Sequence, residues 1–228
     1  MRADTARPSR VWSARNWRSL ALRWRPGKRG RLDERFIHSV RSQPPIRGKQ
    51  KDHCAAVEAL VALDQELTRD TELHCMGGFV LSEHYGLVRA TGDVDVLESA
   101  GTDKATIARL AGRGSPLHKR HRVYIDIVTV ADVPDDYDTR LVAMDIEGLT
   151  RLRLKAFERH DLIFAKLCRN IDRDREDVVA LARGPGLDID VLRQRYQEEL
   201  RPKLGRPERE DLTLRLWIEI IKEIRGGA

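Results

Sequence analysis

Apolar side chains recur along the chain in two ways: in short β-branched or alternating runs, and at the three-to-four-residue spacing of an amphipathic helix. The short runs predict strands over Leu73–Met76, Asp93–Glu98 and Arg122–Val130, with Leu152–Phe157 as an edge strand. The helical spacing predicts helices over Asp52–Asp70, Phe79–Tyr85, Thr102–Leu110, Asp161–Asn170, Arg173–Ala182, Ile189–Leu200 and Glu208–Ile224. We therefore expect an α+β fold, in which a small mixed β-sheet with helices is followed by a C-terminal helical region.

Polar residues between these segments predict helix ends and connections. Thr102 is expected to cap the helix that follows it. Residues 131–150 are expected to form a connector with a turn around Pro134-Asp135-Asp136. The basic cluster HKRHR at 118–122 is interpreted as a solvated loop; the alternative is a surface that steers RNA or a nucleotide.

Length and composition favour one well-buried domain. The chain has 228 residues, of which 41% are hydrophobic and 34% charged. No apolar run approaches the roughly 20 residues that a bilayer-spanning helix needs, so we expect no membrane segment and a cytoplasmic protein. Three widely spaced cysteines without a C-x-x-C pair argue against a disulfide framework or a structural zinc site.

The net charge of +6 comes from the first fifty residues alone. Residues 1–50 hold 14 lysines and arginines against 3 acidic residues, whereas residues 51–228 hold 28 against 33. The segment 1–50 also contains three of the four tryptophans and four prolines, and it cannot build a core of its own. We interpret it as a disordered leader or start-site artefact. A nucleic-acid-binding arm and a targeting peptide are the alternatives.

Two carboxylates, Asp93 and Asp95, are separated by one residue in a predicted strand and therefore point to the same face. Their repulsion is relieved by a divalent cation, which prefers oxygen ligands. A third carboxylate, Asp126, lies within the apolar strand 122–130, where a charge is costly unless it is paired or bound to metal. If the two strands are neighbours, the three form a Mg²⁺ platform for phosphoryl or nucleotidyl transfer, with Asp126 helping to activate the nucleophile.

Each of these carboxylates also has a simpler interpretation. Asp93 and Asp95 can lie at an exposed strand end beside Arg89, and Asp126 can pair with Arg122 or another arginine across the sheet.

The glycine pair Gly77-Gly78 follows a predicted strand and precedes a predicted helix. Glycines at such a place let backbone N–H groups approach a phosphate closely. A Gly-Gly pair alone is most often a simple turn, but its position before the Asp93/Asp95 pair indicates nucleotide binding.

The run GGFVLSEHYGLVRATGDVDVL (77–97), followed by IDI (125–127), resembles the signature of the polymerase β nucleotidyltransferase superfamily. HDLIFAKLCRNIDRDREDVVALA (160–182) resembles the helical lysine–arginine–aspartate pattern of AbiEii-like nucleotidyltransferase toxins. Residues 160–182 and the tail 192–219 are more similar still to an uncharacterised bacterial family of stand-alone nucleotidyltransferase-like proteins. The resemblance implies that residues 51–158 form the nucleotidyltransferase-like core and 159–228 a C-terminal helical region of the same domain.

By position, the resemblance assigns Asp93, Asp95 and Asp126 to catalysis and metal binding, and Lys166 and Asp177 to the nucleotide cleft. Lys166 is expected near the phosphates. The two can face one cleft only if the helix breaks between them, for which Asp172–Asp174 is the expected place. A surface position for Lys166, or an ion pair of Asp177 with Arg173, is the alternative.

The implied activity is Mg²⁺- or Mn²⁺-dependent transfer of NMP from an NTP to an acceptor hydroxyl. The toxin group suggests tRNA or another RNA as acceptor and a cognate antitoxin as partner. Gly78 and Phe79 depart from the serine and threonine that often occupy these positions. This departure favours a second reading, a degenerate protein that binds a nucleotide or a protein partner without catalysis. The third reading is a nucleic-acid-binding module that uses the basic arm.

Overall fold

The computed structural model describes residues 50–87 and 91–226, with side chains from residue 55 onward. All the described residues belong to one compact unit. The interpretations of residues 1–49, and of Arg89 as a neighbour of the aspartates, therefore lie outside the described residues and stay predictions. Among the described residues, no helix combines the length and the apolar character that crossing a bilayer requires.

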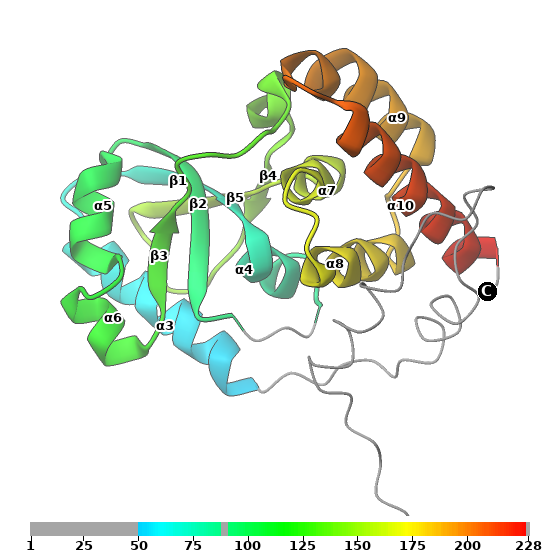
Figure 1. Cartoon of the computed structure of the whole chain (residues 1–228). Coiled ribbons are helices and arrows are strands. Elements are labelled where there is room, and N and C mark those ends of the chain that lie inside the picture. The colour runs from blue at the N-terminus through cyan, green and yellow to red at the C-terminus, as the bar shows by residue number, and fades with distance from the viewer. Residues whose placement is uncertain (1–49, 88–90, 227–228) are drawn as a thin grey trace, which may run out of the picture. The chain divides into compact units, whose positions relative to one another are not determined.

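Helices and strands alternate in the first two thirds of this unit, and helices follow (Figure 1). In chain order the elements are α3 (Gln50–Glu66), β1 (Thr71–Met76), α4 (Gly77–Glu83), β2 (Asp93–Ala100), α5 (Lys104–Ala111), α6 (Pro116–His121), β3 (Tyr124–Ile127), the 3₁₀ helix η1 (Asp135–Arg140), β4 (Val142–Met144), β5 (Leu152–Ala156), α7 (Arg159–Leu167), α8 (Asp172–Arg183), α9 (Ile189–Arg195), the π-helical turn η2 (Tyr196–Leu200), the 3₁₀ turn η3 (Arg201–Lys203) and α10 (Glu208–Gly226). The order confirms the predicted α+β class.

The five strands form one mixed sheet in the order β3-β2-β1-β5-β4. β1 pairs antiparallel with β2 and parallel with β5, β3 lies parallel to β2, and β4 pairs antiparallel with β5. The expectation that residues 152–157 form an edge strand is wrong, because β4 takes that place. The alternating burial of Leu152, Leu154 and Ala156 reflects the inner position of β5.

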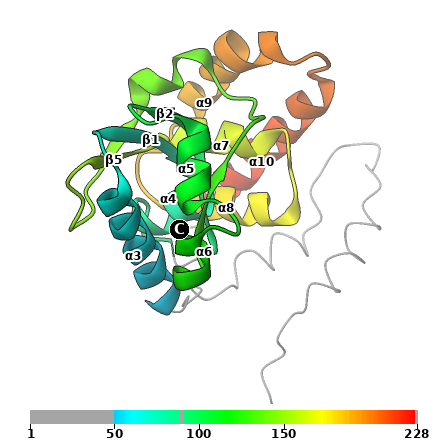
Figure 2. The same ribbon diagram turned by 90° about the vertical axis from the view of Figure 1, so that its left-hand side faces the viewer.

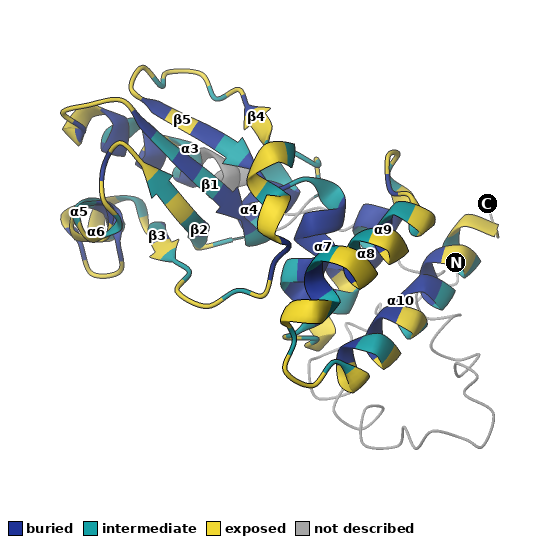
Figure 3. Ribbon diagram, turned by 90° about the horizontal axis from the view of Figure 1, so that it is seen from above, coloured by how far each residue is buried: buried dark blue, intermediate teal, exposed yellow. Residues whose placement is uncertain are grey.

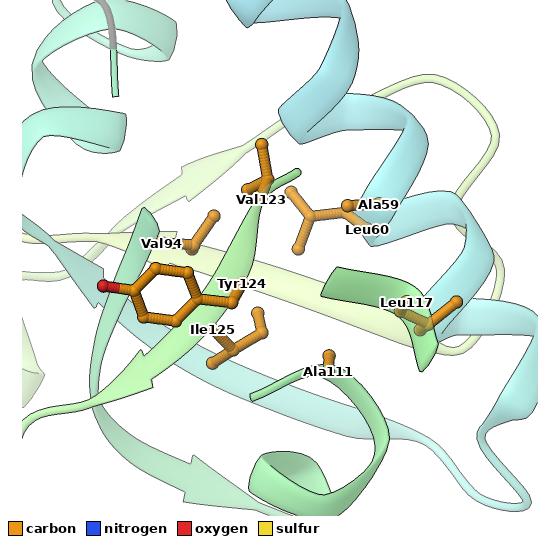
Figure 4. Close-up of a pocket in the computed structure, with 8 residues that line it drawn as sticks. All are labelled: Ala59, Leu60, Val94, Ala111, Leu117, Val123, Tyr124 and Ile125. Carbon is orange, nitrogen blue, oxygen red and sulfur yellow. The ribbon is translucent and has the colours of Figure 1, made fainter. Parts of the chain in front are cut away.

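One face of the sheet is covered by α3, α5 and α6, which lie side by side in Figures 1 and 2. Buried side chains of α3, such as Leu60 and Leu63, supply the apolar surface there. Figure 4 shows the contact: Val94 and Ile125 lie near Leu60 and line a shallow apolar pocket with residues of these helices. Because side chains alternate across a strand, the residues next to Val94 and Ile125 face the opposite side of the sheet.

The C-terminal helices pack against one another, with α8 contacting both α7 and α10. Figure 3 shows buried and exposed residues alternating along these helices, as expected for amphipathic segments. Trp217 on α10 and Phe164 on α7 are buried in this layer.

Three local predictions differ from the structure. Asp103, rather than Thr102, caps α5: its carboxylate accepts the Thr106 N–H at 2.9 Å, while the Thr102 hydroxyl lies 2.6 Å from that of Thr71. The cluster at 118–122 is largely helical rather than a loop, because Ser115 caps α6 and accepts the His118 N–H. The break between Lys166 and Asp177 falls at residues 168–171, before the expected place, and Asn170 there has a φ of 45°.

Candidate active site

The predicted carboxylates lie on two adjacent parallel strands. β2 and β3 pair in register, so that Asp93 is opposite Tyr124 and Asp95 is opposite Asp126. Adjacent strands are separated by about 4.8 Å, and paired residues share a face of the sheet. Asp93, Asp95 and Asp126 therefore point to the face opposite α3, α5 and α6. The condition set by the sequence, that the two strands be neighbours, is fulfilled.

Asp126 differs from its predicted environment. Its side chain is exposed because β3 is the edge strand, so the charge avoids the cost of burial that the apolar flanks suggested. Within the described part of the chain Asp126 makes no ion pair with Arg122 or another cation. The exposed carboxylate faces solvent directly beside the half-buried Asp95.

Gly77 lies against Asp95. A Cβ atom at this position would lie 1.6 Å from Asp95 Oδ2. The backbone φ of +73° is also one that residues other than glycine rarely adopt. Gly77 begins α4, whose next turn buries Phe79 completely. The first glycine therefore makes room for the carboxylate; its expected contact with a phosphate stays a prediction.

The pKa of Asp95 is raised from 3.8 to about 6. Loss of solvent is the largest cause, and the negative charges of Asp93 and Asp126 add to it. The positive charges of Lys166 and Arg169 offset only part of this effect. The site therefore has an excess of negative charge that a cation would neutralise.

Asp93 is held from two sides. The Thr91 hydroxyl donates to its Oδ1 at 2.7 Å, and the Tyr124 hydroxyl lies 3.4 Å from its Oδ2. The guanidinium of Arg113 lies over the Tyr124 ring, 4.3 Å from its centroid, and also donates to the Tyr124 hydroxyl. No sequence pattern indicates this arginine–tyrosine pair, which forms because the chain returns from α5 to the edge of the sheet.

Lys166 and Asp177 meet across the break between α7 and α8. Lys166 Nζ donates to Asp177 Oδ2 at 2.7 Å and lies 3.7 Å from Asp174 Oδ1. Both Lys166 and Asp177 are buried, which excludes the surface position considered for Lys166. Burial lowers the pKa of Lys166, while the carboxylates of Asp174 and Asp95 act in the opposite direction. Residues 166 and 177 are therefore in direct contact, and their place at a nucleotide cleft stays a prediction.

Arg169 and Asp174 extend this cluster. Arg169 donates to both carboxylate oxygens of Asp174, at 2.9 and 2.6 Å, and Asp174 also accepts the Ile171 N–H at 3.1 Å. Asp174 is fully buried, whereas the Arg169 side chain is 59% exposed. Arg169 is thus oriented by a buried carboxylate while it stays accessible. The sequence analysis singled out neither Arg169 nor Asp174, although the D-x-x-D spacing from Asp174 to Asp177 is a usable signal.

The carboxylates of β2 and β3 offer a divalent cation an incomplete set of oxygen ligands. Among the described residues, no three histidine, cysteine, aspartate or glutamate side chains gather in the geometry of a ready-formed metal site. Mg²⁺ in nucleotide-dependent enzymes commonly takes one or two carboxylates and completes its shell with phosphate oxygens and water. Asp93 and Asp95 on one strand, with a raised pKa at Asp95, fit that mode of binding.

The comparisons with known proteins agree with this geometry. The family described as nucleotidyltransferases of unknown function (DUF6036) matches residues 57–225, which include every candidate residue named above. No significant match was found among the curated proteins or the solved structures.

Proposed function

The chain belongs to this family of nucleotidyltransferases of unknown function, and we propose that it transfers NMP from an NTP to an acceptor hydroxyl in a Mg²⁺- or Mn²⁺-dependent reaction. One observation carries the proposal: Asp93 and Asp95 lie on one face of β2, in register with Asp126 on the parallel neighbour β3. The shared face of the three acidic side chains supports the proposal, because a metal-bound triphosphate needs several carboxylates close together.

In this proposal Asp93 and Asp95 are the metal ligands and Asp126 completes the site. A bound divalent cation supplies charge neutralisation at the triphosphate. Thr91 and Tyr124 orient Asp93, and Gly77 gives Asp95 its space. Asp126 is exposed at the edge of the sheet, so its carboxylate is suited to accept the proton of an approaching hydroxyl.

The phosphate side of the site is formed by α7 and α8. Arg169 is the accessible cation here, and a guanidinium can bind two phosphate oxygens at once. Lys166 contributes its charge from a buried position, where Asp177 holds its ammonium. Gly77 and Gly78 are proposed to face the nucleotide from the start of α4. We further propose tRNA or another RNA as acceptor, and a protein antitoxin as the partner that holds the enzyme inactive.

A second candidate is a catalytically degenerate protein that binds a nucleotide or a protein partner without transfer. The 2.7 Å contact between Lys166 and Asp177 favours it, because this lysine is already neutralised before any phosphate arrives. The buried Phe79 favours it too, because its side chain offers no hydroxyl to the cleft.

The test is label transfer by the full chain with each α-³²P-labelled NTP in turn, Mg²⁺ or Mn²⁺, and total tRNA. The paired control variants are Asp93→Asn and Asp190→Asn, the latter on the exposed surface of α9. The proposal expects transfer that Asp93→Asn abolishes and Asp190→Asn preserves. Metal-dependent nucleotide binding without transfer would instead show that the protein is catalytically degenerate and binds the nucleotide only.

A further inference from the structure

A basic surface lies on the segment that leads through α6 into β3, the edge strand that carries Asp126. From Lys104 to Ile125 the chain carries six lysines or arginines and no aspartate or glutamate, although residues 51–228 as a whole are acidic. Lys119, Arg120 and Arg122 are exposed, and within the described residues none of the three has a carboxylate partner. Glu58 of α3 approaches the same segment, but at the neighbouring His121: its Oε2 lies 3.7 Å from His121 Nδ1. Three exposed, uncompensated cations in four residues form a site for a polyanion.

This surface is joined to the active site by Tyr124. Tyr124 is the first residue of β3 and pairs with Asp93. The Arg113 guanidinium lies over its ring, and the centroid of the His118 ring lies 5.2 Å from the centroid of the Tyr124 ring. Figure 4 shows the ring extending away from the apolar side chains beneath α3 and α6. An aromatic ring with an arginine stacked on it is a platform on which a nucleobase can lie.

We propose that Arg113, Lys119, Arg120, Arg122 and Tyr124 form the binding surface for a single-stranded RNA end that presents the acceptor hydroxyl. The inference rests on the proposed function, because it gives the acceptor a place beside Asp93. The free cations of α6 hold the phosphates, and the Arg113–Tyr124 pair holds a base at the edge of the sheet. A neutral small-molecule acceptor has no need of three unpaired cations, so RNA fits this surface better.

The experiment measures RNA binding by fluorescence anisotropy over a series of salt concentrations, with the full chain and a labelled single-stranded RNA of about 20 nucleotides. The α6 variant is Lys119→Gln with Arg120→Gln. Its matched control is Arg206→Gln with Lys222→Gln, which removes two exposed charges near and on α10. Residues 1–50 carry 14 basic residues in all these proteins, so the comparison between the two variants cancels their contribution.

For single strands each lost phosphate contact lowers the slope of log K against log salt by about 0.7. The α6 variant is expected to bind several-fold more weakly, with the slope reduced by about 1.4, while the control matches wild type. Tyr124→Leu is expected to lose about fivefold or more without a change of slope, because base stacking is uncharged. Equal slopes and affinities in the α6 variant and the control would overturn the inference.

The two proposals fail in different ways. Asp93→Asn is expected to abolish transfer while RNA binding stays intact. If RNA binding depends on α6 but wild type transfers no label, the proposed activity is wrong and the surface stands as an RNA site. If the α6 variant transfers label as well as wild type does, the proposed activity stands and the acceptor is bound elsewhere.

Discussion

Replacing Asp95 with asparagine is expected to stabilise the protein. Asp95 is half-buried beside Asp93 and Asp126, and its pKa is raised from 3.8 to about 6. The ionised carboxylate is therefore disfavoured in the folded state relative to the unfolded chain. Removal of a residue that the proposed activity requires should increase stability, because the carboxylates are arranged for a metal rather than for the fold.

The size of the effect follows from the pKa. One pKa unit corresponds to about 1.4 kcal/mol, so a rise from 3.8 to about 6 is equivalent to about 3 kcal/mol at most. This penalty is fully present above about pH 6 and disappears as the pH falls toward 3.8, where the carboxyl is protonated in both states. An amide also loses solvent on burial, so we expect a gain of about 1 to 3 kcal/mol at about pH 8 and a small one near pH 4.

The assay is urea unfolding of wild type and Asp95→Asn without added metal, at both pH values. Asp64→Asn is the matched control, since Asp64 is a buried aspartate with the opposite behaviour. Burial alone would raise its pKa, but hydrogen bonds from Leu152, Thr150 and Arg151 outweigh burial and lower it. Asp64→Asn should therefore destabilise by about 1 to 3 kcal/mol. An Asp95→Asn protein that is no more stable than wild type at about pH 8 would refute the reasoning.

Further variants test the metal site, the glycine at Asp95 and the cluster around Lys166. In metal titrations, the affinity of wild type for Mg²⁺ or Mn²⁺ should fall as the pH drops through about 6, because a proton competes with the metal for Asp95. Asp126→Asn should move that fall to lower pH, because the charge of Asp126 helps to raise the pKa of Asp95. Gly77→Ala should weaken metal binding and cost about 1 to 3 kcal/mol in urea unfolding, whereas Gly205→Ala, whose added Cβ would meet no atom within 4 Å, should change stability little. Asp174→Ala should cost about 1 to 3 kcal/mol, because the Arg169 guanidinium and the Ile171 N–H lose their shared acceptor while Lys166 keeps Asp177. Arg169→Ala should mainly reduce nucleotide affinity in calorimetry, and a comparable loss of stability would argue that Arg169 is structural.

The sequence was most informative where a local rule fixes the direction of a side chain. Period-two alternation placed Asp93 and Asp95 on one face, and the β-branched run 122–130 indicated the strand that carries Asp126. The position of a strand within the sheet is set by tertiary pairing, which local patterns do not record. For that reason the burial expected of Asp126, and the edge position expected of residues 152–157, were wrong.

In the cluster around Lys166, too, local spacing predicted one feature and tertiary packing determined another. The eleven-residue spacing from Lys166 to Asp177 correctly required a break in the helix. Asp174 becomes the buried partner of Arg169 because of the way α8 packs after Asn170, whose φ is positive. The residue types in this segment do not predict that packing. The Arg113–Tyr124 pair is likewise a product of the return from α5 to β3.

The most direct test of the central claim is binding of Mn²⁺ to the full chain in the presence of a non-hydrolysable NTP analogue, measured by electron paramagnetic resonance. The account predicts stoichiometric Mn²⁺ binding that depends on the nucleotide and is lost in the Asp93→Asn, Asp95→Asn double variant. The Asp190→Asn variant should bind as wild type does. Equal Mn²⁺ binding by the double variant and the wild type would contradict the claim that these carboxylates hold the metal.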